Sequence, residues 1–194
     1  TVALTGDGGD EVFAGYERFY AAVLSEKIPR PIGRSLNVVA RAMPGGGNYK
    51  SVVNKARRFL SRFDEELPER FRSWISIFRR EELEKMLRVA PSEAALGRSF
   101  RTCLHHAAPA DLTNQLLYLN AKTYLLDDLN AKVDRASMSV SLETRSPFLD
   151  TELMDYAFRL PGHLKLHGRS LKWILKRAFP DLLPTEISQR GKMG

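Results

Sequence analysis

Three carboxylates and three glycines fall within the six residues Gly-Asp-Gly-Gly-Asp-Glu at positions 6–11, directly after the short apolar segment 2–5. We expect a strand to end here and a helix to begin. Such a junction gathers free backbone N–H groups and the positive end of a helix dipole, so it can bind an anion without a side-chain cation. The carboxylates of Asp7, Asp10 and Glu11 would repel a bare anion. The predicted ligand is therefore a polyphosphate carried with Mg²⁺, or a cationic or protonated nucleophile.

The spacing of these residues excludes several common motifs. A dinucleotide-binding fingerprint needs a glycine where this chain has Glu11, and a P-loop needs a Gly-Lys-Ser/Thr ending that is absent. An EF-hand loop needs acids at alternate positions, which this segment does not provide. A structural alternative stays open, in which Asp10 caps a helix and Glu11 favours its dipole.

The composition is that of an ordinary globular protein. With 194 residues, 43% of them hydrophobic, the chain can build one core, and its single cysteine, Cys103, excludes an internal disulfide. We find no apolar run of membrane-spanning length and no charged leader, and expect a cytoplasmic protein without a membrane segment. Because the chain opens inside a predicted strand and a single strand cannot form a sheet, we expect residues 1–194 to be a single-domain fragment.

Hydrophobic periodicity predicts a mostly helical chain with one or two strands. Apolar residues at helical spacing predict a first helix over 10–24 and further helices within 32–40, 50–96 and from 111 onward. Glycines at 45–47 predict a break. Residues 143–150 form a predicted extended turn, whose Asp150 should cap a helix that begins near Thr151. A last amphipathic helix is predicted around 171–179.

Three separated blocks of this sequence together resemble the synthetase domain of the asparagine synthetase family. They are residues 4–16 (LTGDGGDEVFAGY), residues 127–150 (with DDL, DRASM and ETRSPFLD), and residues 164–177 (with LKL and KWILKR). Residues 190–194 also look like the start of the family's closing motif. The order and the spacing of the blocks agree with the family, whereas segment 25–110 carries no motif that we can match.

The resemblance implies the C-terminal part of an α/β adenine nucleotide alpha-hydrolase-like domain, the PP-loop ATP pyrophosphatase fold, with mostly helices and one or two strands in this piece. In the family a Ser-Gly-Gly-x-Asp-Ser loop and a glutaminase domain with an N-terminal catalytic cysteine lie upstream. Cys103 cannot replace that cysteine. We therefore expect neither tight ATP binding nor amide formation from residues 1–194 alone.

The activity implied by the resemblance is that of a glutamine-dependent amidotransferase, a carbon–nitrogen ligase that uses ATP and Mg²⁺. ATP activates a small carboxylate substrate, aspartate by default, as an acyl adenylate with release of pyrophosphate, and ammonia then attacks to give the amide. A related enzyme that amidates another carboxylate would look alike in these blocks. Relatives that close a β-lactam ring tend to carry Tyr at the position of Asp7, so Asp7 favours ammonia as the nucleophile.

The same resemblance assigns roles to individual residues. Lys172 would hold the phosphates and stabilise the transition state, Asp10 would bind the metal, and Asp7, where the family often carries Glu, would handle the proton of the attacking amine. The glycine turn and Lys172 should then meet around one polyphosphate. The phosphate-binding residues would be Gly6, Gly8, Gly9 and Lys172. The substrate pocket would include Asp7, Glu11, Lys132, Asp134, Arg135, Glu143 and Arg145. Of these charges, we expect those in the second block, at positions 132–145, to be buried and paired. An alternative for Lys172 is a solvated lysine on an amphipathic helix.

A second class of function rests on the net charge of +7. A basic helical nucleic-acid-binding module could use the arginines at 57, 58, 62, 70, 72, 79 and 80. We favour a solvated, salt-bridged surface instead, because glutamates at 65, 66, 69, 81 and 82 lie among these arginines. Steeply salt-dependent binding to unrelated nucleic acids would support the module. A homodimer stays open as the assembly.

Overall fold

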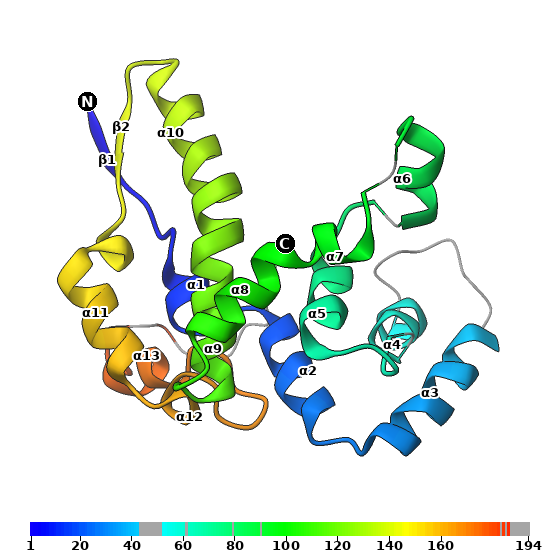
Figure 1. Ribbon diagram of the computed structural model, residues 1–194. Helices are drawn as coiled ribbons and strands as arrows, with labels where there is room; N and C mark the ends of the chain where they lie inside the picture. The colour runs from blue at the N-terminus through cyan, green and yellow to red at the C-terminus, as the bar shows by residue number, and fades with distance from the viewer. Residues whose placement is uncertain are drawn as a thin grey trace. The chain divides into compact units, whose positions relative to one another are not determined.

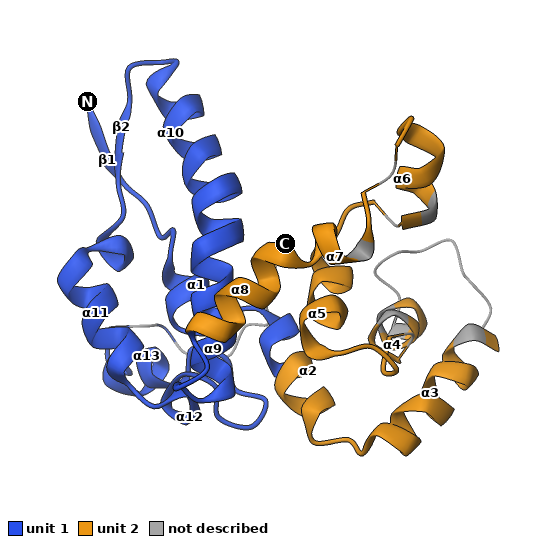
Figure 2. Ribbon diagram, viewed as in Figure 1, with its two compact units in different colours: residues 1–20, 107–194 blue, residues 21–106 orange. Residues whose placement is uncertain are grey.

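The computed structural model describes residues 1–42, 52–60, 62–78, 80–89, 91–182, 184 and 186 (Figure 1). The predicted break at 45–47 and the motif at 190–194 lie outside the described residues. The span that we predicted as a single domain contains two compact units, unit 1 with Thr1–Tyr20 and Ala107–Gly194, and unit 2 with Ala21–His106 (Figure 2). No helix among the described residues has the length and apolar character that a membrane span requires.

Unit 1 is built around a parallel pair of short strands. β1 (Val2–Leu4) pairs with β2 (Glu143–Arg145), with Ala3 opposite Thr144. The Thr5 amide continues the ladder by donating to the Arg145 carbonyl at 2.9 Å. The prediction of a mostly helical chain with one or two strands is confirmed for the described residues. Two strands do not test the PP-loop fold, which stays a prediction.

The predicted helix 10–24 is wrong, because the chain breaks it in the middle. α1 (Gly9–Val12) and α2 (Glu17–Glu26) are separate helices. Between them Ala14 adopts a left-handed φ of 57°, and the Gly15 amide turns back to the Asp10 carbonyl at 2.8 Å. Hydrophobic spacing alone does not reveal a turn of this kind, since apolar residues continue at helical spacing on both sides of it.

A long helical run follows in unit 1. α9 (Leu112–Asn120), the π-helical segment η1 (Ala121–Asn130) and α10 (Ala131–Met138) succeed one another without a break. The run begins at Asp111, whose carboxylate accepts the Asn114 amide at 3.0 Å and so satisfies a backbone donor of the first turn. π-helical segments are rare and frequently mark functional sites.

The last helices of unit 1 close its core. The 3₁₀ helix η2 (Pro147–Leu149) precedes α11 (Thr151–Arg159), α12 (Gly162–Lys165) and α13 (Trp173–Ala178). The predicted cap is confirmed, since the Asp150 carboxylate accepts the Leu153 amide at 3.1 Å. A hydrophobic cluster joins α1 to these elements through Val12, Phe13, Phe148, Leu153, Met154, Ala157, Ile174 and Leu175.

Unit 2 consists of helices joined by turns, without a strand among its described residues. It holds most of α2 and then α3 (Arg30–Ala42), α4 (Val52–Leu60), α5 (Leu67–Ile75), α6 (Arg80–Met86), α7 (Glu93–Leu96) and α8 (Arg98–His106). Its core is aromatic: the Phe59 ring packs against Phe63 at 5.0 Å and Trp74 at 5.6 Å between centroids. Trp74 is therefore part of a packing face.

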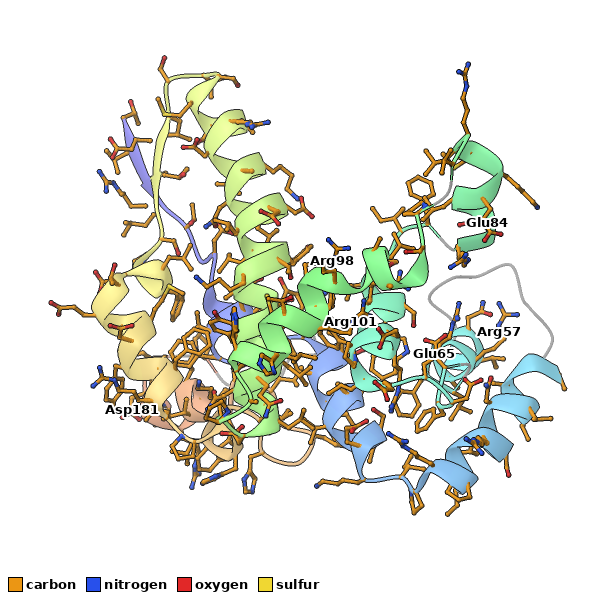
Figure 3. All side chains as sticks on the ribbon, in the orientation of Figure 1. Arg57, Glu65, Glu84, Arg98, Arg101 and Asp181 are labelled. Atoms are coloured by element: carbon orange, nitrogen blue, oxygen red, sulfur yellow. The ribbon has the colours of Figure 1, made fainter. Side chains whose placement is uncertain are left out.

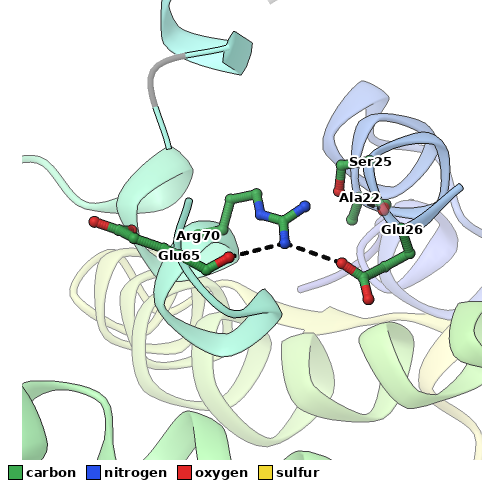
Figure 4. A network of polar contacts seen from close by, with 5 residues as sticks. All are labelled: Ala22, Ser25, Glu26, Glu65 and Arg70. Carbon is green, nitrogen blue, oxygen red and sulfur yellow. Dashed lines mark hydrogen bonds and ion pairs between the residues drawn. The ribbon is translucent and has the colours of Figure 1, made fainter. Parts of the chain in front are cut away.

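Several arginines in unit 2 form ion pairs with carboxylates. The buried Arg70 guanidinium contacts the Glu26 carboxylate and the Glu65 carbonyl, each at 3.0 Å (Figure 4). Arg101, labelled in Figure 3, pairs with Glu69. Two local pairs, Arg62–Glu65 and Arg80–Glu84, lie on the surface of this unit. The salt-bridged surface that we favoured for this region agrees with these contacts.

Candidate functional site

The glycine turn after β1 is shaped by close packing. Gly8 has a φ of 85°, and a Cβ there would lie 2.3 Å from the Leu149 side chain. Both the backbone angle and the space therefore require glycine. Gly9 faces the Phe148 ring and the Lys172 ammonium, which a Cβ would meet at 3.3 and 3.7 Å. Gly8, rather than Asp10, is the N-cap of α1, so the structural alternative with Asp10 as the cap is wrong.

The Lys172 ammonium lies against the turn and pairs with Asp10. Its Nζ atom is 2.6 Å from the Asp10 Oδ1 atom, and the two side chains are 35% and 25% exposed. Lys172 precedes α13 as its N-cap in a left-handed conformation, with φ 52° and ψ 37°. The alternative of a solvated lysine on a helix face is therefore wrong. The structure therefore brings together the glycine turn and Lys172, which we expected to meet.

Gly15 completes this arrangement and was not among the predicted site residues. A Cβ at Gly15 would lie 1.9 Å from Asp10 Oδ1 and 2.4 Å from Lys172 Cε. The ion pair therefore fits only against a glycine. The sequence holds a signal, because Gly15 belongs to the first resembling block, but its spacing does not reveal the contact with a residue near the other end of the chain.

An open pocket of about 470 Å³ lies beside the turn. Its lining residues come from the β1 and β2 ends, from the helical run and from η2: Thr5, Asp7, Asn130, Val133, Asp134, Thr144, Arg145, Ser146, Pro147, Leu149 and Asp150. Three predicted pocket residues, Asp7, Asp134 and Arg145, are thus brought together. The Ser146 hydroxyl donates to the Asp7 carbonyl and ties the turn to the segment after β2.

Glu11, another predicted pocket residue, does not line this pocket. Its side chain is buried, and its carboxylate accepts a hydrogen bond from the Tyr16 hydroxyl. The Arg18 guanidinium stacks over the Tyr16 ring at 3.9 Å and over Tyr124 at 4.9 Å, and donates to Asn120 at 2.8 Å. Burial, together with Glu11, raises the pKa of Tyr16 above its ordinary value, and burial lowers the pKa of Arg18.

The remaining predicted pocket residues lie on the surface. Lys132 pairs with Asp128 at 3.5 Å on exposed positions of the helical run, and Arg145 pairs with Glu143 at 2.5 Å. Arg135 is also exposed. Our expectation that these charges are buried is wrong for this structure. Lys132, Arg135 and Glu143 are not lining residues of the pocket.

The Asp10 carboxylate is a candidate ligand for a metal ion at the turn. Among the described residues, no group of three or more His, Cys, Asp or Glu side chains lies close enough to hold a metal. Mg²⁺ keeps several waters and commonly binds through one or two carboxylates together with substrate phosphates. The Asp10 oxygens therefore fit an ion that arrives with a polyphosphate.

Comparisons with known proteins identify the family of the chain. The family model described as asparagine synthase matches residues 1–194. The chain is 30% identical, over all of its length, to glutamine-hydrolysing asparagine synthetase 1 of Bacillus subtilis (strain 168) and to a putative glutamine-hydrolysing asparagine synthetase of Mycobacterium tuberculosis (strain ATCC 25618 / H37Rv). It covers 30% and 29% of these two relatives. The chain therefore belongs to the asparagine synthase family.

A more distant relative carries a different name. The amidase chyE of Penicillium rubens is 27% identical over the whole chain, which covers 32% of that protein. No solved structure matches the chain.

Proposed function

We propose that the protein containing this chain forms an amide from a carboxylate in an ATP-dependent reaction, with aspartate as the default acceptor. Family membership supports the reaction class. The observation that carries the proposal to particular residues is the Asp10–Lys172 pair, with Nζ and Oδ1 2.6 Å apart against the glycine turn.

The charges of the turn suit the first half of such a reaction. A carboxylate oxygen attacks the α-phosphorus of ATP, the bond to the bridging oxygen breaks, and pyrophosphate leaves. Anion attacks anion here, so fixed cations must offset the repulsion. We assign that role to the Lys172 ammonium, with Gly6, Gly8 and Gly9 offering backbone to the phosphates. Mg²⁺ held by Asp10 would neutralise further phosphate charge.

The neighbouring pocket suits the second half. Ammonia attacks the acyl carbon, AMP leaves with the bond electrons, and the extra proton on nitrogen must go to a base. Asp7 lines the pocket and carries a carboxylate for that proton. Asp134 and Arg145 line the same pocket and would bind the acceptor's charged groups. The other predicted pocket residues would act from outside this pocket; they are Glu11, Lys132, Arg135 and Glu143.

Segments outside this chain would supply the remaining machinery in our proposal. The two first relatives are named as glutamine-hydrolysing, so we infer an upstream glutaminase domain as the source of ammonia. A PP-loop segment on the same sheet would complete the nucleotide site. A homodimer stays open as the assembly.

One similarity favours a second candidate for the acceptor acid. The amidase chyE aligns over the whole chain, so the same turn and pocket could serve a carboxylate other than aspartate. The two alternatives differ only in the acceptor, and one assay separates them.

The test is pyrophosphate release by the full-length protein with ATP, Mg²⁺ and ammonia or glutamine, across a panel of carboxylic acids. We expect release that depends on one acid, and loss of on the order of 100-fold or more in Lys172→Ala with the fold retained. Lys122→Ala serves as the matched control, since Lys122 is exposed on η1. Wild-type kinetics in Lys172→Ala would remove Lys172 from the mechanism, and no release with any acid would refute the proposed reaction.

A further inference from the structure

Lys165 is a buried cation that the proposed reaction does not use. Its side chain has no exposed surface, although lysine is almost never buried in this way without a partner. Its ammonium donates to the Asn114 side-chain oxygen at 2.6 Å and lies 5.0 Å from the Phe158 ring centroid. The burial lowers the pKa of Lys165 to about 8. Burial of a charged group costs free energy, so we ask which role Lys165 has in the protein.

The partner of Lys165 belongs to a hydrogen-bonded cluster at the start of α9. The side-chain amide nitrogen of Asn114 donates to the Asp111 carboxylate and to the Leu160 carbonyl, each at 2.9 Å. Asp111 also accepts the Gly162 amide at 2.9 Å. A Cβ at Gly162 would lie 2.1 Å from Asp111, so the approach requires glycine. The cluster therefore fixes both ends of α12 to α9.

The chain from this cluster to Lys172 is short and folded back on itself. His167 and Ser170 exchange backbone hydrogen bonds at 3.1 and 2.9 Å, with Gly168 at a φ of 57° in the turn. The His167 ring also contacts the Trp173 ring, with centroids 5.1 Å apart. A displacement of α12 would therefore be transmitted through this hairpin to the start of α13, where Lys172 lies.

We propose that Lys165, through Asn114 and the hairpin 167–170, is a positioning residue that holds the Lys172 ammonium against the Asp10 carboxylate. The inference rests on the proposed function, because Lys172 acts on phosphate there. Lys165 itself touches no substrate. Its contribution is to lock α12, and with it the left-handed Lys172 backbone, in one position.

The test is a double-mutant cycle in the full-length protein, with pyrophosphate release and the KM for each substrate as the readouts. We expect Lys165→Met to lower kcat by on the order of 100-fold, the size expected for a displacement of about 1 Å at a reacting group. The KM for the acceptor acid should be unchanged. In a Lys172→Ala background the same substitution should have little further effect, because residues that act through one another are not additive. Lys122→Met is the matched lysine control.

Three outcomes would overturn the inference: wild-type kcat in Lys165→Met, equal effects of Lys165→Met in both backgrounds, or an equal loss in Lys122→Met. If Lys165→Met does not fold by circular dichroism, Lys165→Leu, which also removes the donor to Asn114, takes its place in the same cycle with the same criteria. Pyrophosphate release by the wild type must be present first. Its absence refutes the proposed reaction, whereas its presence with an unchanged Lys165 variant refutes this inference alone.

Discussion

Each compact unit contains an ion pair packed against a glycine, and the two pairs have different surroundings. In unit 1 Asp10 and Lys172 crowd Gly15, and in unit 2 Glu69 and Arg101 crowd Gly97, where a Cβ would lie 2.5 Å from the Arg101 guanidinium. The pair of unit 2 joins α5 to α8. The pair of unit 1 lies beside a glycine turn and includes a residue in a left-handed conformation.

This difference shows that an ion pair alone does not indicate a site. Arg101 is a planar guanidinium that fits a carboxylate, which suits a structural tie between helices. Lys172 is a compact ammonium that lies against the glycine turn, and in our proposal it would exchange Asp10 for a phosphate oxygen. We therefore expect the unit 1 pair to affect the reaction and the unit 2 pair to affect stability.

The largest expected effect is that of Gly15→Ala. The new Cβ would lie 1.9 Å from Asp10 Oδ1, and the ends of flexible side chains would give way rather than the backbone. We expect the fold to persist and pyrophosphate release to fall by on the order of 100-fold. Gly97→Ala is the matched control, crowded by its own ion pair, and should lower the melting temperature while kcat is retained. Equal losses of kcat in the two variants would remove the distinction between the units.

A second substitution tests the buried polar network behind the turn. Tyr16→Phe leaves the Glu11 carboxylate, only 2% exposed, without its hydroxyl donor. We expect the free energy of unfolding to fall by about 1–3 kcal/mol in urea titrations. Tyr156→Phe, at a position that is 62% exposed on α11, should change it by less than about 0.5 kcal/mol. A similar change in both variants would show that the Glu11 contact contributes nothing.

A third experiment follows the pH dependence of stability at Lys165. The folded-state pKa of about 8 lies below the ordinary lysine pKa of 10.5, so between these values the unfolded chain holds a proton that the folded chain has released. The wild-type free energy of unfolding should therefore rise, relative to Lys165→Met, as the pH increases from about 8 to about 10.5. Urea titrations of both proteins across this window measure the difference. A constant difference would mean that Lys165 stays charged in the folded protein.

The smallest effect is expected at the surface of unit 2. Arg80 pairs with Glu84 at 2.7 Å, four residues along α6, with side chains 39% and 46% exposed. Arg80→Ala should lower the free energy of unfolding by about 0.3–0.5 kcal/mol, and added salt should reduce that loss. A loss of several kcal/mol, or a loss of pyrophosphate release, would contradict the separation of roles between the units.

Local features of the fold could be predicted from the sequence, because they depend on neighbouring residues. The Asp150 N-cap was predicted from the sequence and is present in the structure, because its contact with the Leu153 amide spans only three residues. The break between α1 and α2 could not be predicted in this way. It depends on the left-handed conformation of Ala14, a residue type that hydrophobic spacing reads as helical, and on the return of the Gly15 amide to the Asp10 carbonyl.

The candidate site shows the same division. The glycine turn and Lys172 were identified through a resemblance that includes both ends of the chain, and the structure brings them together at 2.6 Å. The buried state of Glu11 and Lys165 was not predicted. Charged residues rarely lie inside a protein, so composition gives no reason to expect this burial. The structure explains how the two charges are accommodated, because Glu11 accepts from the Tyr16 hydroxyl and Lys165 donates to the Asn114 side chain.

The pairing of β1 with β2 has a consequence for the order in which the chain acquires its structure. All of unit 2 lies in the sequence between the two strands. A ribosome would release the first strand long before its partner, and the helices in between could close on local contacts first. Until residues 143–145 emerge, the edge of the nascent strand that pairs with β2 would lack this partner and would be able to pair with strands of other chains.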